Sequence, residues 1–162
     1  LIASTGKPNI DAIARWLKEP YFNKKPPKST GREQFGMLDL ERRLKELEPI
    51  QSKDLIATMT TFSACVIAHD LSHLFDQKLI RPVEVVVAGG GAQNPALIKE
   101  LRNRLQGIRI VFSREIGIPE NARESLSFAL LAWWNILQKK GSFTKITGAS
   151  RPSVLGSRVA PE

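Results

Sequence analysis

Hydrophobic positions recur at helical spacing in five segments of the chain, with polar residues between them. This spacing predicts amphipathic helices at residues 8–18, 38–47, 52–77, 95–105 and 122–140. The helix at 52–77 carries two apolar stripes, which is typical of a helix packed between layers. Its stripes are Leu55, Met59, Phe62 and Val66 on one side, and Ile56, Ile67, Leu71 and Leu74 on another. The helix at 122–140 has a stripe that we expect to face inward, made of Leu126, Ala129, Leu130, Trp133 and Leu137.

A different pattern occupies residues 83–88, where β-branched residues follow one another with little polar alternation. This is typical of a strand buried on both faces of a parallel sheet. A second strand is predicted at 108–112, so the segment between the two forms a β-α-β unit with the helix at 95–105. Asn9 and Asn94 each precede a predicted helix and are expected to cap it. The sequence therefore predicts an α/β fold with long flanking helices, a basic proline-rich loop at 20–36 and a loop from residue 141.

Length and composition fit one soluble domain of 162 residues, of which 42% are hydrophobic. No apolar run approaches the roughly 20 residues of a membrane helix, and the first residues contain no signal-peptide pattern. Cys65 is the single cysteine, which excludes an intramolecular disulfide and favours a reducing compartment. We expect a cytoplasmic protein with no membrane partner, in which Cys65 is a small core residue. Because the chain begins at Leu1, we expect a fragment or a processed product.

The net charge of +8 makes nucleic acid a candidate partner. The basic residues are scattered, however, and no aromatic residues alternate with them to stack bases. We therefore favour solvated faces and expect no nucleic-acid partner. A basic nucleic-acid binder stays an alternative, which the salt dependence of DNA affinity would test.

Three glycines, Gly89, Gly90 and Gly91, follow the first predicted strand and precede the Asn94–Pro95 helix start. The run matches neither G-x-G-x-x-G nor the phosphate loop G-x-x-x-x-G-K-[ST]. Ligands of open α/β sheets nevertheless sit beyond the carboxyl ends of strands, and a helix N-terminus favours negative charge. One glycine would be enough for a tight turn, so three in a row favour close approach of a ligand.

The loop at 20–36 contains the second candidate site. Lys28 and Arg32 can hold an anion, with Ser29 and Thr30 as hydrogen-bond donors. The spacing Thr30-x-x-Glu33 fits a helix capping box equally well, so both interpretations stay open here.

Glu124 and a histidine pair have functional and structural interpretations. Glu124 follows Asn121 at capping-box spacing, and the alternative is a carboxylate that reaches into a cleft toward a hydroxylated substrate. His69 and His73 have the i, i+4 spacing of zinc ligands. They are the only histidines, and Asp70 is shorter than the glutamate of H-E-x-x-H, so we expect them to pack and predict no metal site.

Several stretches in order resemble the anhydro-N-acetylmuramic acid kinase family and together cover most of the chain. They are EPYFNKKPPKSTGREQFG, KDLIATMTTFSACVIAHDL, VVVAGGGAQNPAL, IGIPENARESLSFALLAW and TGASRPSVLG. The resemblance implies the C-terminal part of an actin/hexokinase-like (ribonuclease H-like) sugar kinase lobe, with residues 1–162 forming one domain and the N-terminal lobe absent. It implies a cytoplasmic enzyme of amino sugar metabolism in peptidoglycan recycling.

The resemblance also implies chemistry and site residues. ATP, with Mg²⁺ on its phosphates, and anhydro-N-acetylmuramic acid would be the ligands, and a homodimer is a candidate assembly. By match to family motifs, Gly89, Gly90, Gly91 and Asn94 would lie on the adenosine side, and Glu124 in the sugar site, which reverses the local preference for capping. Lys28, Ser29, Thr30 and Arg32 match a signature segment, which we expect on the substrate side.

Two family segments have no match in this sequence: an early phosphate-binding turn of Gly-Thr-Ser type, and Asp-Thr-Gly-Pro-Gly-Asn, which carries the general base. We therefore expect no catalytic residue in this chain and no turnover by the chain alone. The alternative is an inactive nucleotide-binding module or remnant.

Overall fold

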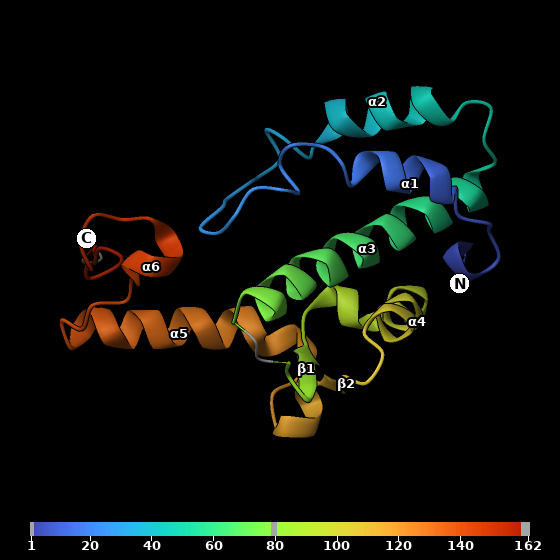
Figure 1. Ribbon diagram of the computed structural model, residues 1–162. Coiled ribbons are helices and arrows are strands. Elements are labelled where there is room, and N and C mark those ends of the chain that lie inside the picture. Colours follow the sequence, from blue (N-terminus) through green and yellow to red (C-terminus); the bar gives the residue numbers. More distant parts are fainter. Residues whose placement is uncertain (1, 79–80, 160–162) are drawn as a thin grey trace.

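A computed structural model describes residues 2–78 and 81–159 and has an α/β architecture (Figure 1). The long helix α3 runs through the molecule, with α1 and α2 on one side and α4 with a small sheet on the other. The helices and strands are η1 (Ile2–Ser4), α1 (Ile10–Trp16), α2 (Met37–Leu47), α3 (Ser52–Lys78), β1 (Glu84–Val87), η2 (Gly90–Gln93), α4 (Pro95–Arg104), β2 (Arg109–Phe112), η3 (Ser113–Ile116), η4 (Glu120–Ala122), α5 (Arg123–Ile136) and α6 (Thr144–Thr147).

An aromatic cluster joins α1, the loop after it, and α3. The Phe62 ring of α3 meets the rings of Trp16 and Phe22 edge to face, with centroids 5.2 and 5.5 Å apart. Leu55, Met59 and Val66 pack against the same cluster. The first predicted stripe of α3 is therefore confirmed as a core-facing surface.

A buried arginine closes this cluster from α2. The side chain of Arg43 is fully buried, and its guanidinium lies 4.7 Å from the Trp16 ring and 4.8 Å from the Phe62 ring. Its Nε donates to Asp39 at 2.8 Å and its Nη2 to Glu19 at 2.9 Å. Burial would raise the pKa of Asp39, but hydrogen bonds from Arg43 and Arg42 outweigh it and hold that pKa below its usual value. The arginine thus fixes α2 and the end of α1 to one core.

A second cluster lies on the opposite side of α3, where Ala64 and Ala68 face Ile98 and Leu101 of α4. Alanine has almost no side chain beyond its Cβ, so it lets the two helices approach closely. Of the predicted second stripe, Leu71 packs here, whereas Ile56, Ile67 and Leu74 are between 38% and 40% exposed. The prediction of two packed sides is confirmed, but small residues rather than the large ones make the second contact.

The sheet has two parallel strands, with Val85 opposite Ile110 and Val87 opposite Phe112. The β-α-β unit predicted from sequence is confirmed. Val85 and Val87 pack toward the second cluster, while Val86 on the other face is 44% exposed. The prediction of a strand buried on both faces is wrong for the described residues, because the second cluster covers the face that carries Val85 and Val87 and leaves Val86 exposed.

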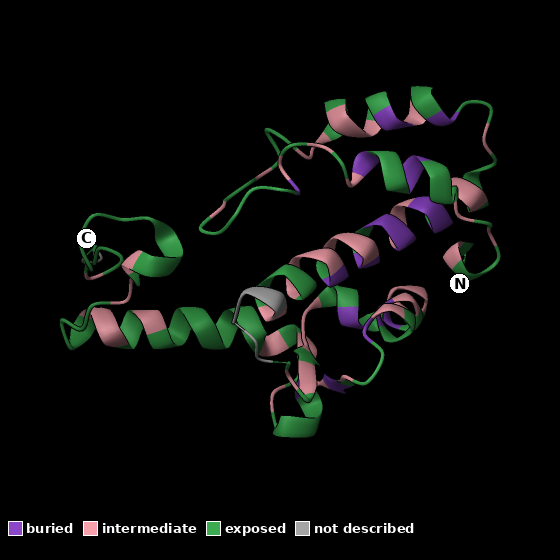
Figure 2. Ribbon diagram, viewed as in Figure 1, coloured by how far each residue is buried: buried purple, intermediate pink, exposed green. Residues whose placement is uncertain are grey.

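The C-terminal part of the chain extends away from both clusters (Figure 1). Helix α5 has no buried residue, and Figure 2 shows it as exposed and intermediate along its length. The inward stripe predicted for it is wrong within the described residues; Leu126, Ala129, Leu130, Trp133 and Leu137 are all exposed. The helix ends at Ile136, and the tail forms the short helix α6 where a loop was predicted; residues 160–162 of that tail lie outside the described residues.

In the described part of the chain, one helix segment, Ser52–Phe75, is long and apolar enough to span a membrane by length and composition. The expectation that no segment comes near this length is corrected accordingly. The apolar composition of α3 also fits a core helix, because α3 packs against other parts of the protein on two sides. The absence of a membrane partner stays a prediction.

Candidate functional site

A glycine turn follows the carboxyl end of β1. Gly89 has φ 81° and ψ −177°, a combination that is essentially restricted to glycine. A Cβ added at Gly89 or Gly90 would meet no heavy atom within 4 Å, and one at Gly91 would touch only Leu97 at 3.5 Å. The turn continues into the 3₁₀ helix η2 instead of a single tight bend. The main chain is therefore open along one side, as a seat for a ligand requires.

Asn94 caps α4, as predicted. Its Oδ1 accepts hydrogen bonds from the N–H groups of Ala96 at 3.1 Å and Leu97 at 3.3 Å. Pro95 has no N–H, and the N–H of Ile98 is bonded to the carbonyl of Asn94. The first turn of α4 thus has no N–H left for a phosphate. The amide Nδ2 of Asn94 is the group of this side chain that remains to face a ligand.

The start of α5 lies beside the glycine turn. The Gly89 N–H donates to the Glu120 carbonyl at 2.9 Å, which joins the turn to the segment just before α5. Glu124 is in the first turn of α5, its carboxylate 3.7 Å from the Arg123 guanidinium and its side chain 78% exposed. The capping interpretation is wrong, because Ala122 occupies the N-cap position and no side chain caps this helix.

The basic loop has a different geometry from either sequence interpretation. Lys28 donates to Asp70 of α3 at 2.8 Å and lies 5.0 Å from the centre of the Tyr21 ring, so its charge already faces a protein carboxylate. Thr30 Oγ1 donates to Gln34 at 3.2 Å. No helix begins at Thr30 among the described residues, so the capping box with Glu33 is wrong.

Thr30 and Arg32 line an open groove of about 880 Å³ between the loop, α2 and α3. No carboxylate of the described residues pairs with Arg32, which is exposed. The groove is mostly apolar; its aromatic walls are Tyr21, Phe22, Phe35 and Phe62. These aromatic walls are not predicted from sequence, although Tyr21, Phe22 and Phe35 flank the Lys28–Arg32 segment and are a signal for a pocket there.

The candidate residues therefore form two groups. The bond between Gly89 and Glu120 joins the turn at 89–94 to the segment just before α5, where Glu124 follows, and Lys28–Arg32 lies on the other loop. Within the described ranges, no hydrogen bond or ion pair joins the two groups. Cys65 is half-buried and packs against the aromatic cluster as expected, and its Sγ accepts a hydrogen bond from Arg104 Nε at 3.0 Å.

Comparison with known proteins gives one consistent family. The family model described as anhydro-N-acetylmuramic acid kinase matches residues 1–161. The kinase of that name from Prochlorococcus marinus strain MIT 9211 is 55% identical over 161 residues, covering 99% of this chain and 42% of the relative. Relatives with the same name from Prochlorococcus marinus strain MIT 9303 and Synechococcus sp. strain CC9605 are each 54% identical, covering 99% and 92% of this chain, and 42% and 39% of their own length.

Proposed function

This chain belongs to the anhydro-N-acetylmuramic acid kinase family, and we propose that it supplies the adenosine side and one wall of the sugar site of an ATP-dependent sugar kinase. It spans about 42% of the length of the curated relatives that it matches. We assign it to the C-terminal part of an actin/hexokinase-like lobe, acting in the cytoplasm in peptidoglycan recycling.

The observation that carries this proposal is the open glycine turn beside β1. The purine base of adenosine is flat and can lie close to a main chain that carries no side chains, and Gly89 and Gly90 leave that approach free. The capping of α4 by Asn94 supports the adenosine side over the phosphates, because the helix start has no N–H to donate. We place Asn94 Nδ2 and the three glycines around the adenosine.

The proposed reaction opens a sugar ring and transfers a phosphoryl group. A general base takes a proton from water as the water attacks the anomeric carbon of anhydro-N-acetylmuramic acid and the bond from that carbon to O6 breaks. O6 then takes the γ-phosphoryl group of ATP, which gives N-acetylmuramic acid 6-phosphate and ADP. Mg²⁺ would neutralise the charge of the phosphates in such a transfer, and we assign it no ligand in this chain. Glu124 would accept hydrogen bonds from the sugar, with Lys28, Ser29, Thr30 and Arg32 as further substrate-side residues.

Nucleotide binding tests this proposal directly. Gly90→Val adds a side chain where the structure has open space, so the fold is expected to persist while the purine nucleoside is blocked. Calorimetry with a non-hydrolysable ATP analogue should show binding to the parent and its loss in Gly90→Val. Ala149→Val, in the exposed tail, is the matched control. Equal affinity of parent and a folded Gly90→Val would remove the nucleotide assignment.

Turnover is tested separately. We expect no sugar-dependent ATP hydrolysis by this polypeptide alone, because no residue here matches the family's general base. Turnover above background would show that the catalytic group lies within residues 1–162. An upstream reading frame that encodes the aspartate segment would support the enzyme over the inactive module.

A further inference from the structure

We propose, in place of the packing role expected from sequence, that His69 and His73 of α3 form an open two-histidine site for a divalent transition metal, with Zn²⁺ as the ion that best fits. The two Nε2 atoms lie 3.3 Å apart, one turn from each other on the helix. This site lies outside the residues assigned to the nucleotide and sugar, and its existence does not depend on the kinase proposal.

The separation of the two nitrogens matches a shared metal ion. Two imidazoles bound to one tetrahedral Zn²⁺ at about 2.0–2.1 Å place their nitrogens about 3.3–3.4 Å apart. A direct N–H···N hydrogen bond at 3.3 Å is long by comparison with ordinary protein hydrogen bonds. The rings now meet edge to face, with centroids 4.4 Å apart and planes at 80°. His73 is exposed, so its ring can turn to direct both lone pairs to one ion.

The second ring nitrogen of His69 supports this assignment. His69 Nδ1 is buried and has no hydrogen-bond partner among the described residues. Metal binding at Nε2 fixes the proton on Nδ1, and Asp70 Oδ1 is 3.7 Å from that atom. A shift of the Asp70 side chain, whose Oδ1 also accepts a hydrogen bond from Lys28 at 2.8 Å, would form the carboxylate–histidine hydrogen bond that commonly orients a metal-bound imidazole.

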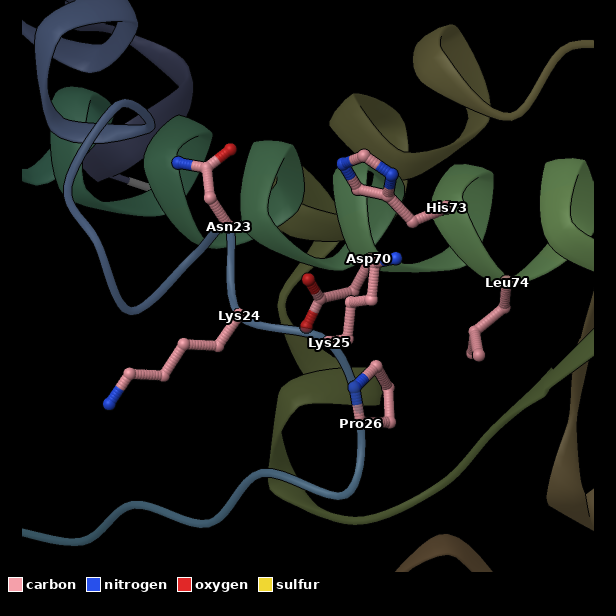
Figure 3. A pocket seen from close by; sticks show the side chains of 7 residues that line it. All are labelled: Asn23, Lys24, Lys25, Pro26, Asp70, His73 and Leu74. Carbon is pink, nitrogen blue, oxygen red and sulfur yellow. The ribbon is translucent and has the colours of Figure 1, made fainter.

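A cavity of about 130 Å³ beside His73 and Asp70 has room for water molecules, and Lys24 and Lys25 also line it (Figure 3). Figure 3 shows the Asn23 carboxamide and the Asp70 carboxylate on the same side of α3 as the His73 ring. Asn23 Nδ2 donates to the carbonyls of Leu17 and Glu19, which leaves its Oδ1 as an acceptor for water. Across residues 2–78 and 81–159, no cluster of three His, Cys, Asp or Glu completes a site. Water therefore fills the remaining positions, and imidazole donors favour zinc, copper or nickel over magnesium.

The experiment is Zn²⁺ titration by calorimetry on the 162-residue chain without a histidine tag and without nucleotide. We expect one ion per chain and a decrease in affinity of about tenfold or more in His69→Ala and in His73→Ala, because each removes one of two protein ligands. Ser72→Ala on the same exposed turn should bind like the parent. Cys65→Ser should also bind Zn²⁺ like the parent, because the Cys65 sulfur accepts a hydrogen bond from Arg104 and is not expected to bind the ion. Circular dichroism of each metal-free variant checks the fold.

A second readout keeps the proposal testable if a variant fails to fold. Zinc added to the parent should shift the ring ¹⁵N signals of both histidines at Nε2, with Nδ1 keeping its proton. Unchanged imidazole signals, zinc affinity retained in a folded His73→Ala, or affinity lost in a folded Cys65→Ser would each overturn the assignment. None of these outcomes bears on the kinase proposal, which the ATP analogue tests independently.

Discussion

Helices α1 and α5 are both amphipathic and both carry tryptophan, yet they have opposite environments. Trp16 of α1 is 2% exposed and packs against Phe62 and Arg43, whereas Trp133 of α5 is 56% exposed. Helix α1 is half the length of α5 but has three buried residues where α5 has none. An apolar stripe therefore specifies which side of a helix prefers burial, and only a second element decides whether burial occurs.

The same comparison holds for polar contacts. Around α1 and α2, Arg43 binds one carboxylate on α2 and one in the loop after α1, and its guanidinium lies against two rings. On α5, the ion pair of Glu124 is with its chain neighbour Arg123 at 3.7 Å, and both side chains are more than half exposed. Exposed ion pairs contribute little to stability, so the start of α5 keeps its carboxylate available for a ligand.

The largest expected effect comes from one substitution made in both helices. Trp16→Ala should lower the free energy of unfolding by about 3–5 kcal/mol, because it leaves a cavity in the aromatic cluster. Trp133→Ala should change it by less than about 0.5 kcal/mol, because the ring lies at the surface. Urea denaturation followed by circular dichroism measures both. Equal losses would mean that α5 is covered in solution, which size-exclusion chromatography would reveal as an assembly.

The next effect separates two adjacent arginines that share the same carboxylates. Arg43→Met should lower the free energy of unfolding by about 3 kcal/mol, because it leaves Asp39 and Glu19 without their buried partner and removes the cation that lies against the two rings. Arg42→Met should cost less than about 1 kcal/mol, because the Arg42 side chain is 51% exposed. Both values come from denaturation at neutral pH. A larger loss in Arg42→Met than in Arg43→Met would contradict the assignment of Arg43 as the central contact.

Acid provides the second measurement on this pair. The pKa of Asp39 in the folded protein lies below its ordinary value. The ionised Asp39 carboxylate therefore adds its full share to the free energy of unfolding well above the unfolded pKa of about 3.9, and this share is lost as the pH falls through the lowered folded pKa. The difference in stability between parent and Arg43→Met should therefore narrow as Asp39 becomes protonated in both. A difference that stays constant down to that pH would assign the effect of Arg43 to stacking alone.

Sequence predicted the features that depend on neighbouring residues. The caps at Asn9 and Asn94, the β-α-β unit and the glycine turn all follow from short motifs, and the structure has each of them. The predicted ends of the helices, including the long α3, agree with the observed ends to within a few residues. Proline, glycine and apolar spacing determine helix ends through neighbouring residues, so a short stretch of sequence is enough to predict them.

The features that sequence failed to predict depend on distant partners. Asp70 neutralises Lys28 from 42 positions away, and nothing near Lys28 indicates that contact. The burial of Arg43 has a local signal in Asp39 four residues earlier, but the rings on either side come from α1 and α3. The groove next to Arg32 likewise needs α2 and α3 to form its walls. Sequence patterns therefore indicate candidate residues, whereas the surroundings of those residues depend on segments far away in the chain.

The smallest expected effect distinguishes two roles of one side chain beside the glycine turn. Asn94→Ala removes the cap of α4 and should lower the free energy of unfolding by about 1 kcal/mol. Asn94→Ser keeps a capping oxygen and should lower it by only a few tenths of a kcal/mol. Asn9→Ala and Asn9→Ser make the same changes at the cap of α1, away from the turn. Both Asn94 variants lack the amide Nδ2, so if that group contacts adenosine, both should weaken binding of the ATP analogue, while the Asn9 variants leave it unchanged. Weakening in Asn94→Ala alone would show that the turn needs the cap for its shape and that the amide touches no ligand.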